Sequence, residues 1–178
     1  MGLFKVGLTL FFKEGLHVLR QIDDLVGGRK IFLDLKLYDT PMQVAGAARI
    51  LQSEAPDVRF LTVHTSGGLR VIQAVVEVMK GTTEVLGVTA LTSQDQREAT
   101  GRCGSTPLEE HVLALADIAK AAGAAGVVAS AHESAAIKTR FGETMTIVTP
   151  GIRPVWAKVP DDDQRRKMTP AAAIARGA

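Results

Sequence analysis

The stretch Asp34-Leu-Lys-Leu-Tyr-Asp39 decides how this 178-residue sequence is interpreted. It begins at the end of residues 30–34, whose β-branched and aromatic content predicts an inner strand, and Thr40-Pro41 comes next as the start of a helix. Side chains two residues apart share one face of a strand, so Asp34 and Lys36 are expected to form an adjacent pair of opposite charges. Desolvating such a pair is costly. The pair is therefore either a salt bridge that only ends the strand or a site for chemistry, and the rest of the sequence favours chemistry.

Composition narrows the class of protein. With 46% hydrophobic residues the chain can bury one core, so residues 1–178 are expected to form a single domain. A net charge of +2 with interspersed signs gives little reason to expect nucleic acid as a partner. The lone Cys103 fits a reducing compartment. The apolar runs are too short to span a bilayer, and the first residues lack a signal-peptide pattern, so we expect a cytoplasmic protein without a membrane partner.

Short apolar runs alternate along the chain with amphipathic, Ala-rich stretches. Strands are predicted at residues 3–7, 30–35, 59–64, 84–90, 125–130 and 145–149, and helices at residues 13–25, 42–54, 69–79, 108–122 and 133–141, with a last helix beginning at Thr169-Pro170. Strands that are apolar on both faces and alternate with helices predict a parallel sheet covered by helices.

Two α/β architectures share this alternation: an open doubly wound sheet and a (β/α)8 TIM barrel. An open sheet that binds a dinucleotide would carry G-x-G-x-x-G in its first turn, and residues 7–11 do not supply it. A barrel instead places functional residues at the carboxyl ends of many strands. Polar residues recur at that position, namely Asp34, Lys36, His64, Thr65, Ser66, Thr89, Thr92, Ser130, Thr149 and Arg153. The barrel is therefore favoured, although six predicted strands and 178 residues fall short of the eight strands and roughly 200 or more residues usual for this fold.

Further segments give the chain a resemblance to a known family. Besides residues 32–41, they are Phe4-Lys-Val-Gly7, Val63-His-Thr-Ser-Gly-Gly68, Val88-Thr-Ala-Leu-Thr-Ser93, Gly126-Val-Val-Ala-Ser130, Val148-Thr-Pro-Gly-Ile-Arg-Pro154, Asp163-Gln-Arg-Arg166 and Met168-Thr-Pro170. In this order they resemble the bacterial orotidine 5'-phosphate decarboxylases over essentially the whole chain. D-x-K-x-x-D alone also occurs in phosphosugar decarboxylases and aldolases of the same barrel suprafamily. The combination with TPGIRP, DQRR and MTP is far more specific.

The resemblance implies an activity and its catalytic residues. The reaction would convert orotidine 5'-monophosphate to uridine 5'-monophosphate and CO2, without a metal or an organic cofactor. Lys5, Asp34, Lys36 and Asp39 would form an alternating charge network, and Lys36 would donate a proton to C6 of the pyrimidine. Such a network is oriented in advance towards charge that develops only in the transition state.

The resemblance also implies how the substrate is held. The substrate-binding residues would be Lys5, Asp34, Thr40, Thr92, Arg153 and Gln164. Residues 153–168 would form a lid over the phosphate. The positions that match Asp39 and Thr40 enter the site of a partner subunit in this family, which implies a homodimer with shared active sites.

Two family segments have no match in the chain. The family begins with a strand and helix that carry an Ala-Leu-Asp segment and ends with a strand that carries Gly-Arg-Pro, so we expect a partial barrel that lacks both ends. The loss would open one gap, because the first and last strands are neighbours in a closed barrel. Two alternatives therefore stay open: a related phosphosugar decarboxylase or synthase that uses Mg²⁺, and a non-catalytic barrel remnant that acts as a scaffold.

Overall fold

The sheet is the frame of the molecule. The computed structural model describes residues 2–55, 57–98, 106–157 and 164–178, so Cys103 lies outside the described residues. The described strands form one sheet in the order β1-β2-β3-β4-β5-β6, and neighbouring strands are parallel. Their bounds are β1 (Phe4–Gly7), β2 (Ile31–Leu37), β3 (Val58–His64), β4 (Glu84–Val88), β5 (Gly126–Val128) and β6 (Thr146–Val148). The prediction of six parallel strands in a partial barrel is confirmed.

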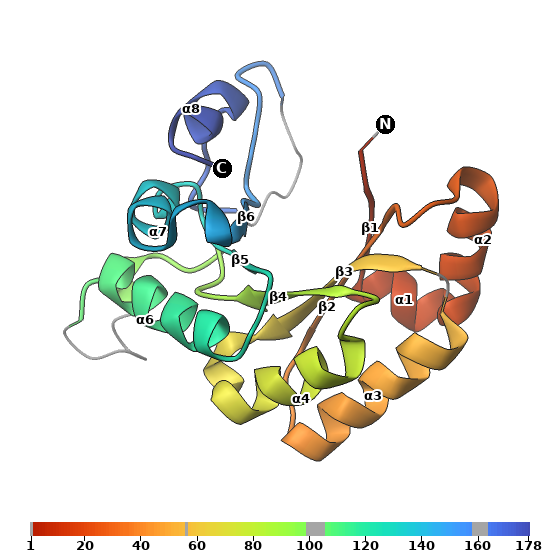
Figure 1. Ribbon diagram of the computed structural model, residues 1–178. Helices are drawn as coiled ribbons and strands as arrows, with labels where there is room; N and C mark the ends of the chain where they lie inside the picture. Colours follow the sequence, from red (N-terminus) through yellow and green to blue (C-terminus); the bar gives the residue numbers. More distant parts are fainter. Residues whose placement is uncertain (1, 56, 99–105, 158–163) are drawn as a thin grey trace.

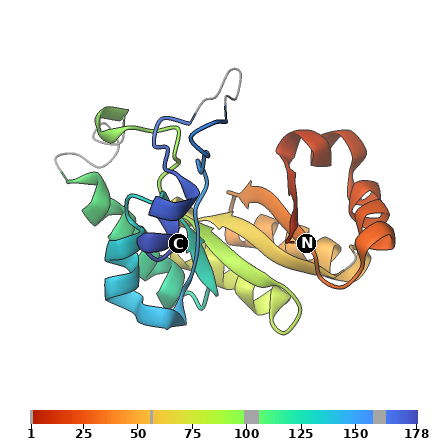
Figure 2. The ribbon, with the colours of Figure 1, turned by 90° about the horizontal axis from the view of Figure 1, so that it is seen from above.

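Most of the helices lie around the outer side of the curved sheet, whereas the last helix stands apart at one end of the molecule, as Figure 1 shows, and Figure 2 gives the same arrangement from above. The helices are α1 (Leu8–Glu14), α2 (Leu16–Val26), α3 (Pro41–Glu54), α4 (Leu69–Met79), α6 (Leu108–Ala121), α7 (Ser134–Phe141) and α8 (Pro170–Ala175), with short 3₁₀ turns at η1 (Thr65–Gly67) and η2 (Gly142–Thr144). No helix among the described residues has both the length and the apolar character needed to cross a membrane.

One helix prediction was wrong. Residues 13–25 were expected to form a single helix, but α1 begins at Leu8, directly after β1, and ends at Glu14, and Gly15 separates it from α2, which begins at Leu16. Gly15 has a φ of 60°, which a helix cannot accommodate and which glycine adopts readily. None of the seven residues of α1 is buried, and its apolar residues follow those of β1 without a break, so the sequence carries no clear signal for the start of this helix.

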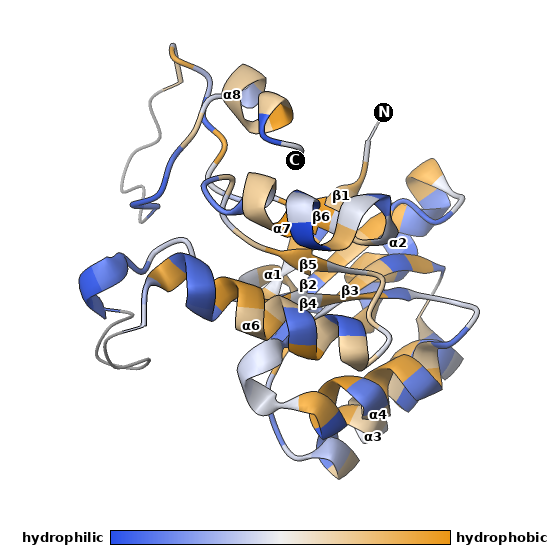
Figure 3. Ribbon diagram, turned by 60° about the vertical axis from the view of Figure 1, so that its left-hand side comes forward, coloured by the Kyte–Doolittle hydropathy of each residue, from blue (hydrophilic) through white to orange (hydrophobic). Residues whose placement is uncertain are grey.

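Alternation along the strands divides the core into two layers. Leu33 on β2 and Leu61 on β3 point outwards and pack against the helices in the larger apolar cluster. The inner face of the sheet carries a second, smaller cluster of Phe32, Phe60, Leu86, Val88 and Val128. The rings of Phe32 and Phe60 meet edge to face, with centroids 5.8 Å apart. Figure 3 shows apolar residues concentrated in the strands and alternating with polar residues along the helices.

Gly87 lets α6 approach β4 closely. A Cβ atom at this position would lie 2.8 Å from Cβ of Ala119 on α6 and 2.7 Å from Cγ2 of Thr65. Both contacts are shorter than packed carbon atoms allow. The outer core layer at this point therefore depends on the absence of a side chain.

We expect Gly87→Ala to lower the free energy of unfolding by about 1–3 kcal/mol, because the added methyl group overpacks the layer between β4 and α6. Gly46→Ala in α3 is the matched control, since its Cβ would meet nothing within 4 Å. That control should raise stability by roughly 0.5–1 kcal/mol through helix propensity. Urea unfolding of both variants measures the two changes, and equal effects of the same sign would contradict the packing argument.

Candidate active site

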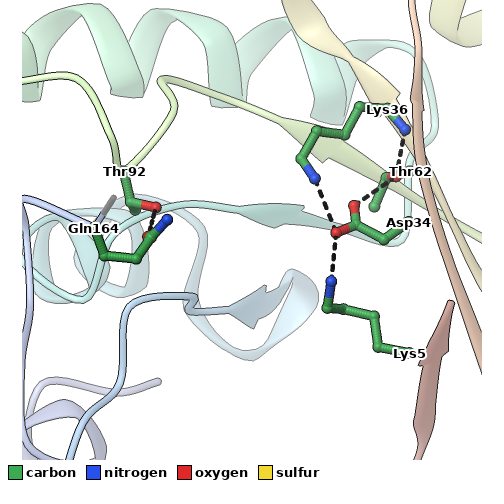
Figure 4. Close-up of polar contacts among 6 residues, drawn as sticks. All are labelled: Lys5, Asp34, Lys36, Thr62, Thr92 and Gln164. Atoms are coloured by element: carbon green, nitrogen blue, oxygen red, sulfur yellow. Dashed lines mark hydrogen bonds and ion pairs between the residues drawn. The ribbon is translucent and has the colours of Figure 1, made fainter. Parts of the chain in front are cut away.

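Five of the predicted site residues line one cavity at the carboxyl ends of the strands. Its volume is about 310 Å³, and it is lined by Lys5, Asp34, Lys36, Val88, Ala90, Leu91, Thr92, Ser93, Val128, Ala129, Pro150 and Gln164. Figure 4 shows the two lysines and the aspartate on one side, with Thr92 and Gln164 on the other. Because the strands are parallel, their carboxyl ends meet at one rim, and residues far apart in sequence converge there. The site is a polar rim above the apolar inner cluster.

Asp34 is the centre of the charge network. The ammonium groups of Lys5 and Lys36 both donate to its Oδ2, at 3.0 Å and 2.8 Å respectively. The Asp34 side chain is only 10% exposed, while those of Lys5 and Lys36 are 55% and 34% exposed. One buried negative charge therefore holds two positive charges at the mouth of the cavity. The predicted pairing of Asp34 with Lys36 is confirmed.

The pairing is not produced by a regular strand. Leu33 on β2 pairs with Leu61 on β3, and the next pair is Leu37 with Val63, so the residues from Asp34 to Lys36 lie opposite Thr62 alone. Lys36 has a φ of 49°, in the left-handed region, which costs a non-glycine residue about 1–3 kcal/mol. A bulge of this kind redirects side chains and is common beside active sites.

Thr62 is the site residue that the sequence reasoning missed. Its side chain is fully buried, its Oγ1 accepts the backbone N–H of Lys36 at 2.8 Å, and its hydroxyl donates to Oδ1 of Asp34 at 3.0 Å. The signal that could have found it is alternation on β3, where Thr62 is a polar residue on the same inner face as Phe60. Both carboxylate oxygens of Asp34 are therefore hydrogen-bonded.

Two features of the surroundings of Asp34 shift its pKa in opposite directions. Burial by itself would raise the pKa of this carboxyl group, but the hydrogen bonds and positive charges of Lys36 and Lys5 outweigh it and hold the pKa below its ordinary value. Asp34 is therefore an anion throughout the physiological pH range.

The lowered pKa of Asp34 makes stability depend on pH. An unfolded aspartate has a pKa of about 3.9, so the stabilisation from the Asp34 ion pairs is present above that pH and is lost as the pH falls through the folded-state pKa. We expect unfolding free energy to fall with acid more steeply in the wild type than in Asp34→Asn, which cannot take up this proton. At neutral pH the variant should be the less stable protein, because Lys5 and Lys36 then face each other without a carboxylate.

Urea unfolding across the acid range measures this difference. Asp117→Asn, which removes the exposed carboxylate that pairs with Arg140, serves as the control. An Asp34→Asn profile parallel to that of the wild type would contradict the assignment.

Thr92, in the segment after β4, makes hydrogen bonds to the segment after β6. Its hydroxyl donates to Oε1 of Gln164, and its backbone carbonyl accepts the N–H groups of Arg165 and Arg166, each at 3.3 Å. Ile152 and Met168 form a parallel bridge that joins the two limbs of this segment. Gln164 is therefore held against the cavity from both sides, although residues 158–163 of the predicted lid lie outside the described residues.

The two arginines that follow Gln164 each form an ion pair, one exposed to water and one buried. Arg165 pairs with Asp95 at 3.0 Å, and both side chains are about half exposed. Arg166 pairs with Glu133 beside α7, and these side chains are only 11% and 6% exposed. Nη1 of Arg166 and Oε2 of Glu133 have no hydrogen-bond partner among the described residues. Removing either partner of the buried pair would leave a poorly compensated charge.

We expect Glu133→Gln to lower the free energy of unfolding by about 3–5 kcal/mol, because the guanidinium of Arg166 then stays buried without its counter-charge. Asp95→Asn is the matched control, since its ion pair with Arg165 lies in water and an exposed pair contributes little to stability. Urea unfolding at neutral pH compares them. Similar losses in the two variants would show that burial does not set the strength of these pairs.

Three predicted residues lie away from the cavity lining of the described structure. Arg153 follows β6, where its N–H donates to the carbonyl of Met168 at 2.9 Å and its Nη1 to the carbonyl of Ile152 at 3.1 Å. Asp39 and Thr40 are exposed, and Oδ1 of Asp39 accepts the N–H of Thr40 at 2.6 Å. Among the described residues, Lys5 and Lys36 form their ion pairs with Asp34 and not with Asp39 of the same chain. Its role in a partner's site stays a prediction.

Comparison with known proteins places this chain in a family. Residues 2–178 match the sequence model described as the orotidine 5'-phosphate decarboxylase / HUMPS family. The chain belongs to this family. Orotidine 5'-phosphate decarboxylase from Anaeromyxobacter sp. (strain K) is 44% identical over 180 residues, which cover 100% of this chain and 76% of that protein. The same-named protein from Desulfosudis oleivorans is 43% identical, with 100% and 72% covered.

Solved structures agree with the family. The crystal structure of orotidine 5'-phosphate decarboxylase from Lactobacillus acidophilus superposes with a TM-score of 0.79 at 32% identity, and covers 98% of this chain and 74% of that one. That of the Thermotoga maritima protein has a TM-score of 0.68 at 21% identity, which supports the fold. The predicted family resemblance is confirmed, and the fold is the half-barrel form of this family's TIM barrel.

Proposed function

We propose that this member of the orotidine 5'-phosphate decarboxylase family converts orotidine 5'-monophosphate to uridine 5'-monophosphate and CO2, in the cytoplasm, as a step of pyrimidine nucleotide synthesis. The observation that carries the proposal is the pair of lysines on one buried aspartate at the mouth of a 310 Å³ cavity. The names of the relatives support the substrate and the reaction.

The charge network suits the chemistry of decarboxylation. The bond between C6 of the pyrimidine and the carboxylate carbon breaks, CO2 leaves, and the electron pair stays on C6 as a carbanion. The ammonium group of Lys36 stabilises this charge and then transfers a proton to C6, so its amine takes up a proton from water before the next turnover. Lys5 and Asp34 hold Lys36 in place before the charge develops, which is the condition for effective electrostatic stabilisation.

The opposite side of the cavity fits the rest of the substrate. Thr92 and Gln164 line it and supply a hydroxyl and an amide for the pyrimidine or the phosphate. Arg153 would reach the phosphate when residues 153–168 close over it. Closure would expel water and apply the binding energy of the phosphate to the reacting carbon.

We propose a homodimer in which Asp39 and Thr40 act in the partner's site. Their exposure at the end of β2 supports this assignment. Exposed apolar side chains nearby, Tyr38 at 64% and Met42 at 76%, are the kind of surface that an interface covers.

The surroundings of Asp34 favour a reaction without a metal over the Mg²⁺-dependent alternative. Magnesium binds carboxylate oxygens that are open to it, whereas both oxygens of Asp34 already accept hydrogen bonds, two of them from ammonium groups. Two neighbouring positive charges also repel a divalent cation. The scaffold alternative has no need for this buried charge arrangement.

We expect Lys36→Ala to lower the turnover rate of orotidine 5'-monophosphate about 100- to 10,000-fold, because the general acid is lost. The loss of substrate absorbance measures the rate, with EDTA present to remove divalent cations. Lys13→Ala is the control, since the Lys13 side chain is 78% exposed on α1. Binding of uridine 5'-monophosphate is measured in parallel by calorimetry.

The outcomes separate the alternatives. Turnover that EDTA abolishes would favour the magnesium enzyme. Turnover that survives Lys36→Ala would overturn the role of that residue. A chain that neither turns over the substrate nor binds uridine 5'-monophosphate would favour the scaffold.

A further inference from the structure

Thr62 lies where the sheet departs from regular pairing. The residues from Asp34 to Lys36 on β2 face this one residue on β3, so part of the backbone there lacks a ladder partner. A buried backbone N–H needs a hydrogen-bond acceptor. The side chain of Thr62 supplies the acceptor for the N–H of Lys36, which a regular ladder would supply from a carbonyl group.

The hydroxyl of Thr62 links the two charged residues of the site. It accepts from the backbone of Lys36 at 2.8 Å and donates to Oδ1 of Asp34 at 3.0 Å. A hydroxyl group has one proton to donate, and here it is committed to the carboxylate. One side chain therefore fixes both the backbone that carries the lysine and the carboxylate that receives its ammonium group, as Figure 4 shows.

Two neighbouring buried threonines act differently. The hydroxyl of Thr65 donates to the carbonyl of Val88 at 2.7 Å, and that of Thr89 donates to the carbonyl of Val128 at 2.9 Å. Each of these hydroxyl groups therefore donates to a backbone carbonyl at the end of a neighbouring strand. Thr62 differs from them because its partners are a charged side chain and the backbone of the proposed proton donor.

We propose that Thr62 is a positioning residue for the decarboxylation, which rests on the function proposed above. It holds Lys36 in the left-handed conformation, with φ at 49°, and so directs Nζ of Lys36 towards Oδ2 of Asp34 and the cavity. Without the hydroxyl, the backbone of Lys36 loses the contact that offsets its strain, and the ammonium group leaves its place. The cavity lining does not include Thr62, so it acts through Lys36 and Asp34 and not by contact with the substrate.

Thr62→Val tests the proposal, because valine keeps the shape of the side chain and removes only the hydroxyl group. We expect kcat to fall about 10- to 100-fold, the scale of loss that follows from moving a reacting group by about 1 Å. The dissociation constant of uridine 5'-monophosphate should stay unchanged. Thr62→Ser, which restores the hydroxyl, should recover kcat, and Thr89→Val, which removes a hydroxyl from an equally buried threonine, should leave kcat unchanged. An equal fall of kcat in Thr62→Val and Thr89→Val, or unchanged kcat in Thr62→Val, would overturn the proposal.

A second measurement does not need turnover. Trace acetylation with acetic anhydride, followed by mass spectrometry, gives the reactivity of Lys36 relative to the exposed Lys13. This ratio should change in Thr62→Val and stay at the wild-type value in Thr62→Ser and Thr89→Val. An unchanged ratio in Thr62→Val would overturn the positioning of Lys36 by Thr62. If the wild type fails to turn over orotidine 5'-monophosphate while the ratio changes as expected, the proposed function fails and the positioning of Lys36 stands.

Discussion

The buried carboxylate of Asp34 is the constraint on which the site depends. It is a single negative charge, largely removed from water, and it holds the ammonium groups of Lys5 and Lys36 within 3.0 Å. Burial of a lone carboxylate is unfavourable, so the arrangement persists only because the two lysines and the hydroxyl of Thr62 compensate it. The same compensation keeps the group ionised. The result is a fixed local field at the mouth of the cavity, which is what a reaction through a carbanion requires.

The parallel sheet makes this arrangement possible. Lys5 comes from β1, Asp34 and Lys36 from β2, and Thr62 from β3, and these strands are consecutive neighbours in the sheet. Because the strands are parallel, their carboxyl ends lie at one rim of the sheet, where these side chains come into contact. The outer face is occupied by the larger apolar cluster under the helices, so the polar residues at the carboxyl ends are free to serve a site. In each of these strands, the outward-facing side chains therefore pack in the core, whereas the inward-facing side chains near the carboxyl end serve the site.

The segments after β4 and β6 close the opposite side of the cavity by a different means. Their contacts centre on Thr92, and the buried pair of Arg166 with Glu133 anchors the same segment to α7. An exposed ion pair such as that of Arg165 with Asp95 contributes little to stability in water. The position of Gln164 thus depends on one buried ion pair and on backbone hydrogen bonds, and not on the number of surface charges.

The sequence by itself determined the order and type of most elements, because apolar alternation, Pro and Gly signals and polar residues at strand ends are local patterns. It also determined that Asp34 and Lys36 form a pair, and the motif order indicated the family. It could not determine the start of α1, which buries none of its residues. Only the tertiary structure decided the bulge opposite Thr62, the left-handed conformation of Lys36 and the pairing of Arg166 with Glu133. These features arise between strands and segments far apart in the chain, where the register of one backbone against another sets which hydrogen bonds can form, and no local pattern encodes that register.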